Sequence, residues 1–221
     1  MDYVPNKQII AKRIARIFKS GDVANLGIGL PTLVANYVPH DVTLMLQSEN
    51  GLMGLGPSPA EGQVDHDVTN AGGVPVSILP GGCFFDSAMS FAIIRGGHVD
   101  YSVLGVLEVD QEGNLANYTI PGKMVPGMGG AMDLTTGARV VIAATLHFEP
   151  SGASRLKRRR SLPLTAAHEV NFVATDLGFF EVLGNRFFLR EVFSPYTPEF
   201  VTQRTDAAIV VSNDCKIVTI N

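Results

Sequence analysis

The chain has no tryptophan, only two cysteines and few charged residues. Of its 221 residues 17% are charged, against roughly 25% in a typical soluble domain. A surface so poor in charge predicts that another chain covers part of it. Cys83 and Cys215 stand far apart, and no CxxC pair occurs. This usage argues against a disulfide framework and favours a reducing, cytoplasmic location.

Nucleic acid and membranes are both disfavoured as partners, because the sequence has no excess of basic residues and no uninterrupted apolar segment long enough to span a bilayer. The 17 Lys and Arg residues are outnumbered by 21 Asp and Glu, and the net charge of −4 argues against binding nucleic acid. The N-terminal segment has no apolar core of a signal peptide, so we expect none. The uncharged stretches 23–40 and 68–85 are long enough to span a bilayer. Because Gly, Pro, Asn and Ser interrupt both, we interpret them as buried strands and loops and expect no membrane association.

Apolar strands alternate with helical patterns along the whole chain, with no internal repeat and no linker. This alternation predicts one α/β domain over residues 1–221, in which a mixed sheet is layered with helices. A long loop is expected over 48–70. Helices are expected at 5–19, 32–37, 84–95 and 198–204. Strands are expected at 22–26, 42–47, 74–79, 99–109, 115–119, 139–146, 171–174, 179–182, 187–192, 209–211 and 216–220.

The most informative segment is Ser48-Glu49-Asn50-Gly51, which directly follows one of the expected buried strands. Ligands of open α/β sheets bind at the carboxyl ends of strands, which is where this segment would lie. A single carboxylate among glycine amides suits electrostatic or covalent chemistry. The alternative is an ordinary turn, in which Glu49 is solvated and Asn50-Gly51 supplies the bend.

Two glycine-rich segments are further candidates for ligand binding. Gly27 and Gly29 follow a strand and precede a helix, an arrangement that can bind phosphate, although the third glycine of a dinucleotide fingerprint is missing. Gly127, Gly129 and Gly130 lie in residues 121–133, where successive amides can form an oxyanion cradle. A tight strand-to-helix turn is the favoured explanation of the first segment, and close packing of two backbones explains the second equally well.

The remaining features favour structural roles. None of the five histidines has metal-site spacing, and Asp65-His66-Asp67 falls in an expected loop, so we expect no metal. No GxSxG motif is present, which argues against a serine hydrolase. The basic run at residues 155–160 is interpreted as a solvated face or a partner contact, with an anionic ligand such as CoA as the less favoured alternative.

Several segments together closely resemble the β (B) subunit of the 3-oxoacid CoA-transferases, near the acetate/butyrate–acetoacetate members. The matching segments are NLGIGLP (25–31), LQSENGLMGLGP (46–57), TNAGG (69–73), PGGCFFDSAMSFAIIRGGH (80–98) and PGKMVPGMGGAMDLTTGAR (121–139). The resemblance implies a three-layer α/β/α fold with a mixed sheet, and an enzyme that is active only with a separate A (α) subunit, as an α2β2 assembly. It implies CoA as a substrate and no permanently bound cofactor.

The resemblance also assigns roles to residues. Glu49 is implied as the nucleophile of a ping-pong reaction through a γ-glutamyl-CoA thioester, with acids of the acetoacetate, butyrate, acetate and succinate class. The residues implied to line the oxyanion or CoA region are Asn25, Gly27, Gly29, Asn50, Gly51, Gly127, Gly129 and Gly130. Residues 144–157 and 166–169 depart from the family pattern, which leaves substrate and partner contacts open. An acyl-CoA hydrolase using the same glutamate, or a non-catalytic ligand-binding domain of similar fold, remain the alternatives.

Overall fold

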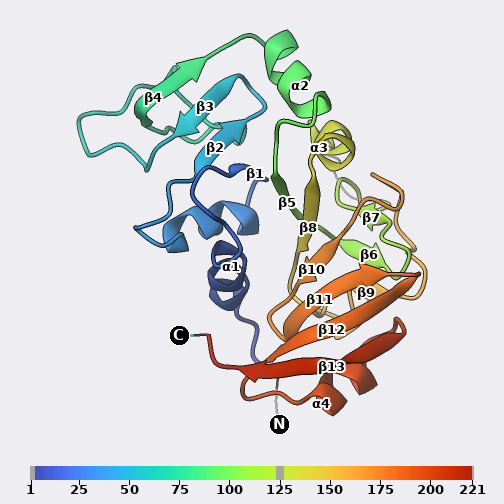
Figure 1. Ribbon diagram of the computed structural model, residues 1–221. Coiled ribbons are helices and arrows are strands. Elements are labelled where there is room, and N and C mark those ends of the chain that lie inside the picture. The colour runs from blue at the N-terminus through green and yellow to red at the C-terminus, as the bar shows by residue number, and fades with distance from the viewer. Residues whose placement is uncertain (1–2, 123–126, 221) are drawn as a thin grey trace.

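The structure is a computed structural model that describes residues 3–122 and 127–220. Within these residues ten strands form one mixed sheet, which runs through the molecule from β4 at one edge to β13 at the other (Figure 1). The strand order is β13-β12-β11-β10-β8-β5-β1-β2-β3-β4. The strands are β1 (Val23–Leu26), β2 (Met45–Ser48), β3 (Leu52–Leu55), β4 (Ile78–Phe84), β5 (Tyr101–Gly105), β8 (Val140–Ala144), β10 (Phe172–Ala174), β11 (Gly178–Leu183), β12 (Arg186–Phe193) and β13 (Ile209–Val218).

The parallel part of the sheet has β1 at the point where the strand order reverses. β1 pairs in parallel with β2 on one side and with β5 on the other, and β8 and β10 continue from β5. Strands β3, β4, β11 and β12 add antiparallel pairings towards the edges. In such sheets ligands bind beyond the carboxyl ends of the strands at this reversal. The loops after β1 and β2 therefore occupy the favoured place for a binding site.

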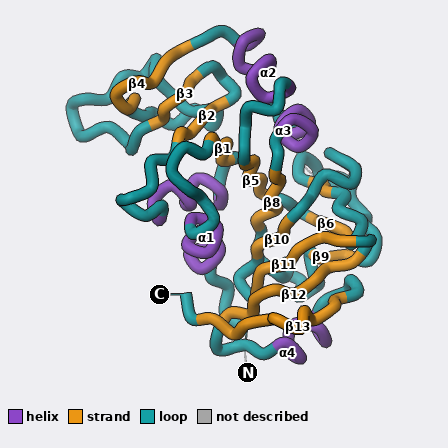
Figure 2. Tube along the Cα trace, viewed as in Figure 1, coloured by secondary structure: helices purple, strands orange, loops and turns teal. Residues whose placement is uncertain are grey.

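Helices cover both faces of the sheet, which confirms the predicted layered α/β fold. Val103 and Ile142 pack towards α1 and the 3₁₀ helix η1, while their neighbours Leu104 and Val141 pack towards α2 and α3. Because successive side chains of a strand point to opposite faces, each short strand contributes to the hydrophobic cores on both sides of the sheet. Figure 2 shows α1 on one side of the central strands and α2 and α3 on the other. The helices are α1 (Lys7–Ala15), η1 (Leu30–Tyr37), α2 (Ser87–Arg95), α3 (Ala131–Gly137) and α4 (Pro198–Arg204).

A small second sheet, in the order β7-β6-β9, packs beside the large one. Its strands are β6 (Glu108–Asp110), β7 (Leu115–Ala116) and β9 (Leu156–Lys157). The sequence predicts one strand over 99–109, but the chain leaves the large sheet after Gly105 and enters the small one at Glu108. An apolar run shows burial but not the neighbour on which it packs, so the division is invisible in the sequence.

Other boundaries differ from the predictions for local reasons. The loop expected over 48–70 contains β3, and the strand expected at 74–79 begins only at Ile78 and extends through two glycines. Helix α1 begins at Lys7, capped by the Asn6 side chain, and ends at Ala15 rather than near residue 19. Helix α2 begins after Asp86, whose carboxylate accepts a hydrogen bond from the Met89 amide.

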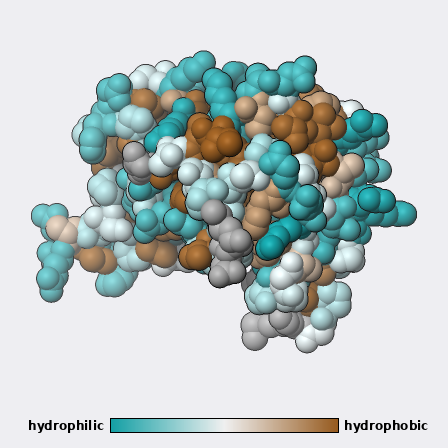
Figure 3. Space-filling view, turned by 90° about the horizontal axis from the view of Figure 1, so that it is seen from below, coloured by the Kyte–Doolittle hydropathy of each residue, from teal (hydrophilic) through white to brown (hydrophobic). Residues whose placement is uncertain are grey.

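Apolar side chains on the face seen from below form separate patches among hydrophilic ones (Figure 3). Such a mixture is usual for exposed protein surface. The described residues contain no helix that is long and apolar enough to cross a membrane. The uncharged stretches 23–40 and 68–85 supply β1, η1 and β4 instead.

A buried polar cluster ties the N-terminal segment to the far part of the sheet. The Asp176 carboxylate accepts hydrogen bonds from the Tyr3 hydroxyl (2.7 Å) and from the amides of Asn6 (3.1 Å) and His147 (2.8 Å). The His147 ring is fully buried, with Nε2 2.9 Å from the Thr205 hydroxyl oxygen. Because Thr205 donates its own proton to the Val201 carbonyl (2.7 Å), Nε2 must be the donor in this contact.

His147 should make stability depend on pH. Burial lowers the pKa of His147 to about 3, whereas an unfolded histidine titrates near 6.5. Between these values the unfolded chain binds the extra proton, so the free energy of unfolding should fall by about 1.4 kcal/mol per pH unit as the pH drops below about 6.5. Urea unfolding at several pH values should give a dependence on pH that is steeper by this amount in the wild type than in His147→Gln.

Asp176 titrates in the opposite sense, so only the difference between the two proteins isolates His147. Burial raises the pKa of Asp176, and this carboxyl alone would favour the folded state as the pH falls towards its unfolded value. The wild type and His147→Gln share this contribution. Identical pH slopes for the two proteins would contradict the assignment to His147.

Candidate active site

A pocket of about 490 Å³ lies at the carboxyl ends of β1 and β2. Its walls come from residues 26–36, 46–49, 55–58 and 70–76, which lie far apart in the sequence. Apolar side chains such as Leu33 and Val76 make up much of the wall, and Glu49 is the one ionisable residue among the described residues that line it. A mostly apolar pocket with a single carboxylate suits an organic ligand with one reactive or polar centre.

Glu49 follows β2 directly, and a buried amide holds its carboxylate. The Asn25 side chain, on neighbouring β1, is 1% exposed, and its Nδ2 donates to Glu49 Oε2 at 3.1 Å. Strand pairing sets this contact, because Asn25 lies opposite Gln47, two residues before Glu49. Glu49 itself is partly buried. The structure therefore gives the carboxylate a fixed partner instead of the free solvation of an ordinary turn.

Gly130 brings a second backbone segment against Glu49. A Cβ atom at Gly130 would lie 3.3 Å from Glu49 Cγ and 3.4 Å from the Phe91 ring, so glycine permits this close approach. Gly127 and Gly129 precede it with φ values of +92° and +54°. Residues 123–126 of the same glycine-rich segment lie outside the described part of the chain. The sequence did not predict α3, which begins immediately after Gly130 and fixes this approach.

Gly27 and Gly29 line the pocket in the turn that follows β1. The Gly27 amide donates to the Val103 carbonyl at 2.8 Å, which holds this turn against β5. Gly29 then precedes the first residue of η1, with φ +89°. The two glycines thus shape the wall, and the short helix predicted to follow them is the 3₁₀ helix η1.

Asn50 and Gly51 shape the turn and do not line the pocket. The Asn50 side chain donates to the Thr69 carbonyl at 2.8 Å, which ties the turn to the loop that closes the pocket. Gly51 has φ +112°, and a Cβ there would overlap the Phe85 carbonyl oxygen. The sequence did not predict the pocket wall at residues 70–76, nor the buried side chain of Gln47 in the wall and that of Ser90 behind it. Polar residues inside otherwise apolar segments were the available signal.

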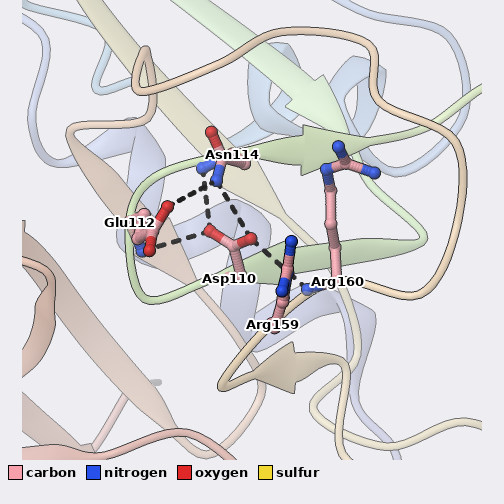
Figure 4. A pocket seen from close by; sticks show the side chains of 5 residues that line it. All are labelled: Asp110, Glu112, Asn114, Arg159 and Arg160. Atoms are coloured by element: carbon pink, nitrogen blue, oxygen red, sulfur yellow. Dashed lines mark hydrogen bonds between the residues drawn. The ribbon is translucent and has the colours of Figure 1, made fainter.

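A second hollow, of about 330 Å³, belongs to the basic run and lies on the small sheet (Figure 4). Its central carboxylate, Asp110, accepts hydrogen bonds from the amides of Glu112 and Asn114 (both 3.1 Å) and from Asn114 Nδ2 (3.0 Å). Arg160 contributes its backbone amide at 3.3 Å. The carboxylate is therefore occupied by the turn that it stabilises.

The basic run itself is divided between internal contacts and solvent. Arg155 donates to the Leu107 carbonyl at 2.9 Å, and Lys157 lies 3.6 Å from Glu149. Arg158 and Arg159 are exposed. These contacts give the run a structural role at the small sheet, away from the segments that line the Glu49 pocket.

Metal and disulfide chemistry find no support in the residues that the structure describes. No group of three or more His, Cys, Asp or Glu side chains among them could hold a metal ion. Asp65, His66 and Asp67 lie in an exposed loop. Cys83 and Cys215 are both free thiols.

Comparison with known proteins identifies the family. The family model described as Coenzyme A transferase matches residues 7–203, and the chain therefore belongs to the coenzyme A transferase family, whose members use CoA as a substrate. The beta subunit of the acetate CoA-transferase of Escherichia coli K12 is 50% identical over 208 residues, covering 94% of this chain and 95% of that protein. The B subunit of the probable succinyl-CoA:3-ketoacid coenzyme A transferase of Bacillus subtilis is 48% identical over 203 residues, covering 92% and 94%.

Solved structures share the fold at low identity. The acyl-CoA transferase YdiF of Escherichia coli O157:H7 matches with a TM-score of 0.76 at 20% identity, over 99% of this chain but only 44% of that one. The glutaconate CoA-transferase of Acidaminococcus fermentans matches with a TM-score of 0.73 at 19% identity, over 100% and 90%. The decarboxylase AibA/AibB also matches, with a TM-score of 0.71 at 20% identity. The same fold thus carries more than one chemistry, and the site must decide between them.

Proposed function

We propose that the chain is the β subunit of a CoA-transferase that moves CoA between an acyl-CoA and a short-chain or 3-oxo acid, with Glu49 as the covalent nucleophile. The position of Glu49 is the observation that carries the proposal. It is the ionisable residue of the pocket where the strand order reverses, it accepts a hydrogen bond from Asn25, and Gly130 lies against it. Such a carboxylate needs no neighbouring base, because carboxylates are ionised at neutral pH.

The reaction follows from that chemistry. The Glu49 carboxylate attacks the thioester carbonyl, and the C–S bond breaks to give a mixed anhydride and CoA thiolate. The thiolate then attacks the Glu49 carbonyl carbon, which releases the first carboxylic acid as its anion and leaves a γ-glutamyl-CoA thioester. The second acid reverses both steps and leaves as its CoA ester. Charge and atoms balance without any further reactant.

Two needs of this reaction are met by features of the site. Each tetrahedral intermediate carries an oxyanion, and removal of one donor from such a site typically costs about 2.7–4 kcal/mol. The backbone around Gly129 and Gly130 is our candidate donor because it lies beside Glu49. The anhydride and the thioester must also be kept from water. The mostly apolar pocket and a covering partner chain would provide that protection.

The partner is proposed to be an A (α) subunit that covers the open side of the pocket, in an α2β2 assembly. The two relatives compared above carry subunit names, and the single YdiF chain is more than twice the length of its match. Large exposed apolar side chains are found on the pocket wall and on nearby elements. They include Ile28 (67% exposed), Val74, Phe84 (62%) and Met89. The proposed partner subunit would remove these apolar side chains from water.

The class of acid is proposed from the names of the relatives. Acetate and 3-ketoacids appear in the names of proteins 48–50% identical over nearly the whole chain. The 490 Å³ pocket has a mostly apolar wall with a few polar side chains such as Asn36 and Asn70, which suits an acyl chain that carries one or two polar groups.

The trapped intermediate tests the mechanism. When the complex of this chain with its partner subunit is incubated with acetoacetyl-CoA and no acceptor acid, we expect one equivalent of acetoacetate to be released. Intact-mass measurement should show this chain heavier by CoA less one water, and peptide mapping should place the adduct on Glu49. Continuous loss of thioester with no adduct would indicate a hydrolase and contradict the proposal. The chain without its partner is expected to form no adduct.

A further inference from the structure

A row of polar side chains crosses the centre of the sheet beneath the active site. Ser102 of β5, Asn25 of β1 and Gln47 of β2 are direct neighbours in the strand register, and all are 0–2% exposed. Ser90 of α2, 0% exposed, packs over the same face. Strands at the centre of a parallel sheet are normally apolar throughout. Within the row, only Asn25 and Gln47 are linked by hydrogen bonds towards Glu49, and this buried amide pair calls for a reason beyond stability.

The hydrogen bonds in the row define how the side-chain amides of Asn25 and Gln47 are oriented. Asn25 Nδ2 lies 2.8 Å from Gln47 Oε1, 3.2 Å from the Gln47 carbonyl and 3.1 Å from Glu49 Oε2. All three are acceptors, so a flipped Asn25 amide would direct its oxygen at three oxygens. Gln47 Nε2 in turn donates to the Ser90 hydroxyl at 3.1 Å. Because the Asn25 N–H group needs an acceptor, Gln47 directs its oxygen towards Asn25 and its Nε2 towards Ser90.

We propose that Gln47 is a positioning residue for Glu49, acting through Asn25. By presenting its oxygen to Asn25, Gln47 holds the Asn25 amide with its N–H groups towards the Glu49 carboxylate. Without that oxygen Asn25 Nδ2 loses its 2.8 Å acceptor and keeps only the 3.2 Å contact with the Gln47 carbonyl besides Glu49, so the amide is held less firmly towards the carboxylate. The inference rests on the proposed role of Glu49 as the nucleophile.

The cost of the arrangement supports a functional reason for it. Asn25 Oδ1, on the side away from Gln47, is buried and has no hydrogen-bond partner among the described residues. An amide with one unsatisfied oxygen in the core is unfavourable for folding. The orientation that is nevertheless adopted is the one that directs both amide hydrogens towards the Gln47 and Glu49 oxygens.

Gln47→Met, in the complex with the partner subunit, tests the proposal. Methionine keeps the length of the side chain and removes its acceptor. We expect kcat to fall about 10- to 100-fold with a much smaller change in KM for acyl-CoA, because methionine keeps the bulk of this part of the pocket wall while the nucleophile is held less firmly. The acid limb of the pH profile of the first half-reaction should move to higher pH, because loss of an oriented hydrogen-bond donor disfavours the ionised form of a carboxylate.

Ser102→Ala is the matched control. Ser102 lies on the opposite side of Asn25 in the same buried row, and its hydroxyl has no hydrogen-bond partner among the residues described. We expect wild-type kcat and an unmoved acid limb. Loss of kcat in Gln47→Met with an unmoved acid limb would overturn the proposal, since a merely structural role predicts that result.

Two further variants separate the possible failures. If Gln47→Met does not yield a folded complex, Gln47→Glu keeps the shape and the acceptor but places a second carboxylate on the Asn25 amide. The acid limb should again move to higher pH, and an unmoved limb overturns the proposal.

Normal exchange by Glu49→Gln would refute the role of Glu49 as the nucleophile. An inactive Glu49→Gln beside a Gln47→Met of wild-type profile would refute only the positioning role.

Discussion

Glu49→Gln in the complex with the partner subunit should lower CoA exchange at least about a thousandfold, because the amide removes the nucleophile and leaves the pocket in place. The side-chain amide that replaces the Glu49 carboxylate is expected to direct its oxygen, and not its nitrogen, towards the Asn25 Nδ2 donor. Exchange between labelled acetate and acetyl-CoA measures the effect, and the CoA adduct on the chain should disappear.

Glu61→Gln is the control for the loss of one carboxylate. Glu61 lies in an exposed part of the loop that leads back to the pocket, and it does not line the pocket. Exchange should remain within about twofold of the wild type. A Glu49→Gln complex that exchanges CoA normally would remove the basis of the proposed function.

Gly51→Ala should destabilise the chain by at least about 3 kcal/mol. The backbone at Gly51 has φ +112°, which side-chain-bearing residues rarely adopt, and the added Cβ would overlap the Phe85 carbonyl oxygen. That backbone cannot simply move away, because the Phe85 amide donates to the Gly51 carbonyl at 3.0 Å. Urea unfolding of the isolated chain, with the midpoint and slope compared to the wild type, measures the loss.

Gly62→Ala separates the two causes. Gly62 has φ +80° but lies in an exposed loop with nothing within 4 Å of the added Cβ, so only the backbone strain remains. We expect a loss of about 1–2 kcal/mol there. Equal losses in both variants would show that the Phe85 contact contributes nothing.

Residues typical of helix ends were sufficient to predict the boundaries of some elements from the sequence. Pro198 and Thr197 mark the beginning of α4 and the predicted range is the observed one, because a proline in the first turn and a capping hydroxyl act within a few residues. Gly96 likewise marks the end of α2. Elements without such signals were predicted with wrong boundaries. The strand predicted at 74–79 is β4, which begins at Ile78 and continues through two glycines to Phe84. Pairing with β3, which supplies its hydrogen bonds, is a non-local interaction.

The neighbouring residues singled out Glu49 as a candidate for electrostatic or covalent chemistry, but they did not predict which side chains surround it. A carboxylate directly after an apolar strand and before glycines is a pattern of neighbouring residues, and motif resemblance added the family. The comparisons confirm the family. The roles of the individual site residues stay predictions. Gly130 and Glu49 are far apart in the sequence, and only α3 and its packing bring them together.

By itself the sequence determined the layered α/β class, the segment that ends in Glu49 and the family, because periodicity, glycine spacing and ordered motifs are properties of consecutive residues. Only the tertiary structure decided which side chains surround that carboxylate. The register of three strands aligns Ser102, Asn25 and Gln47, and a helix from elsewhere in the chain adds Ser90. Strand register is set by packing across the whole sheet, so no local segment contains it.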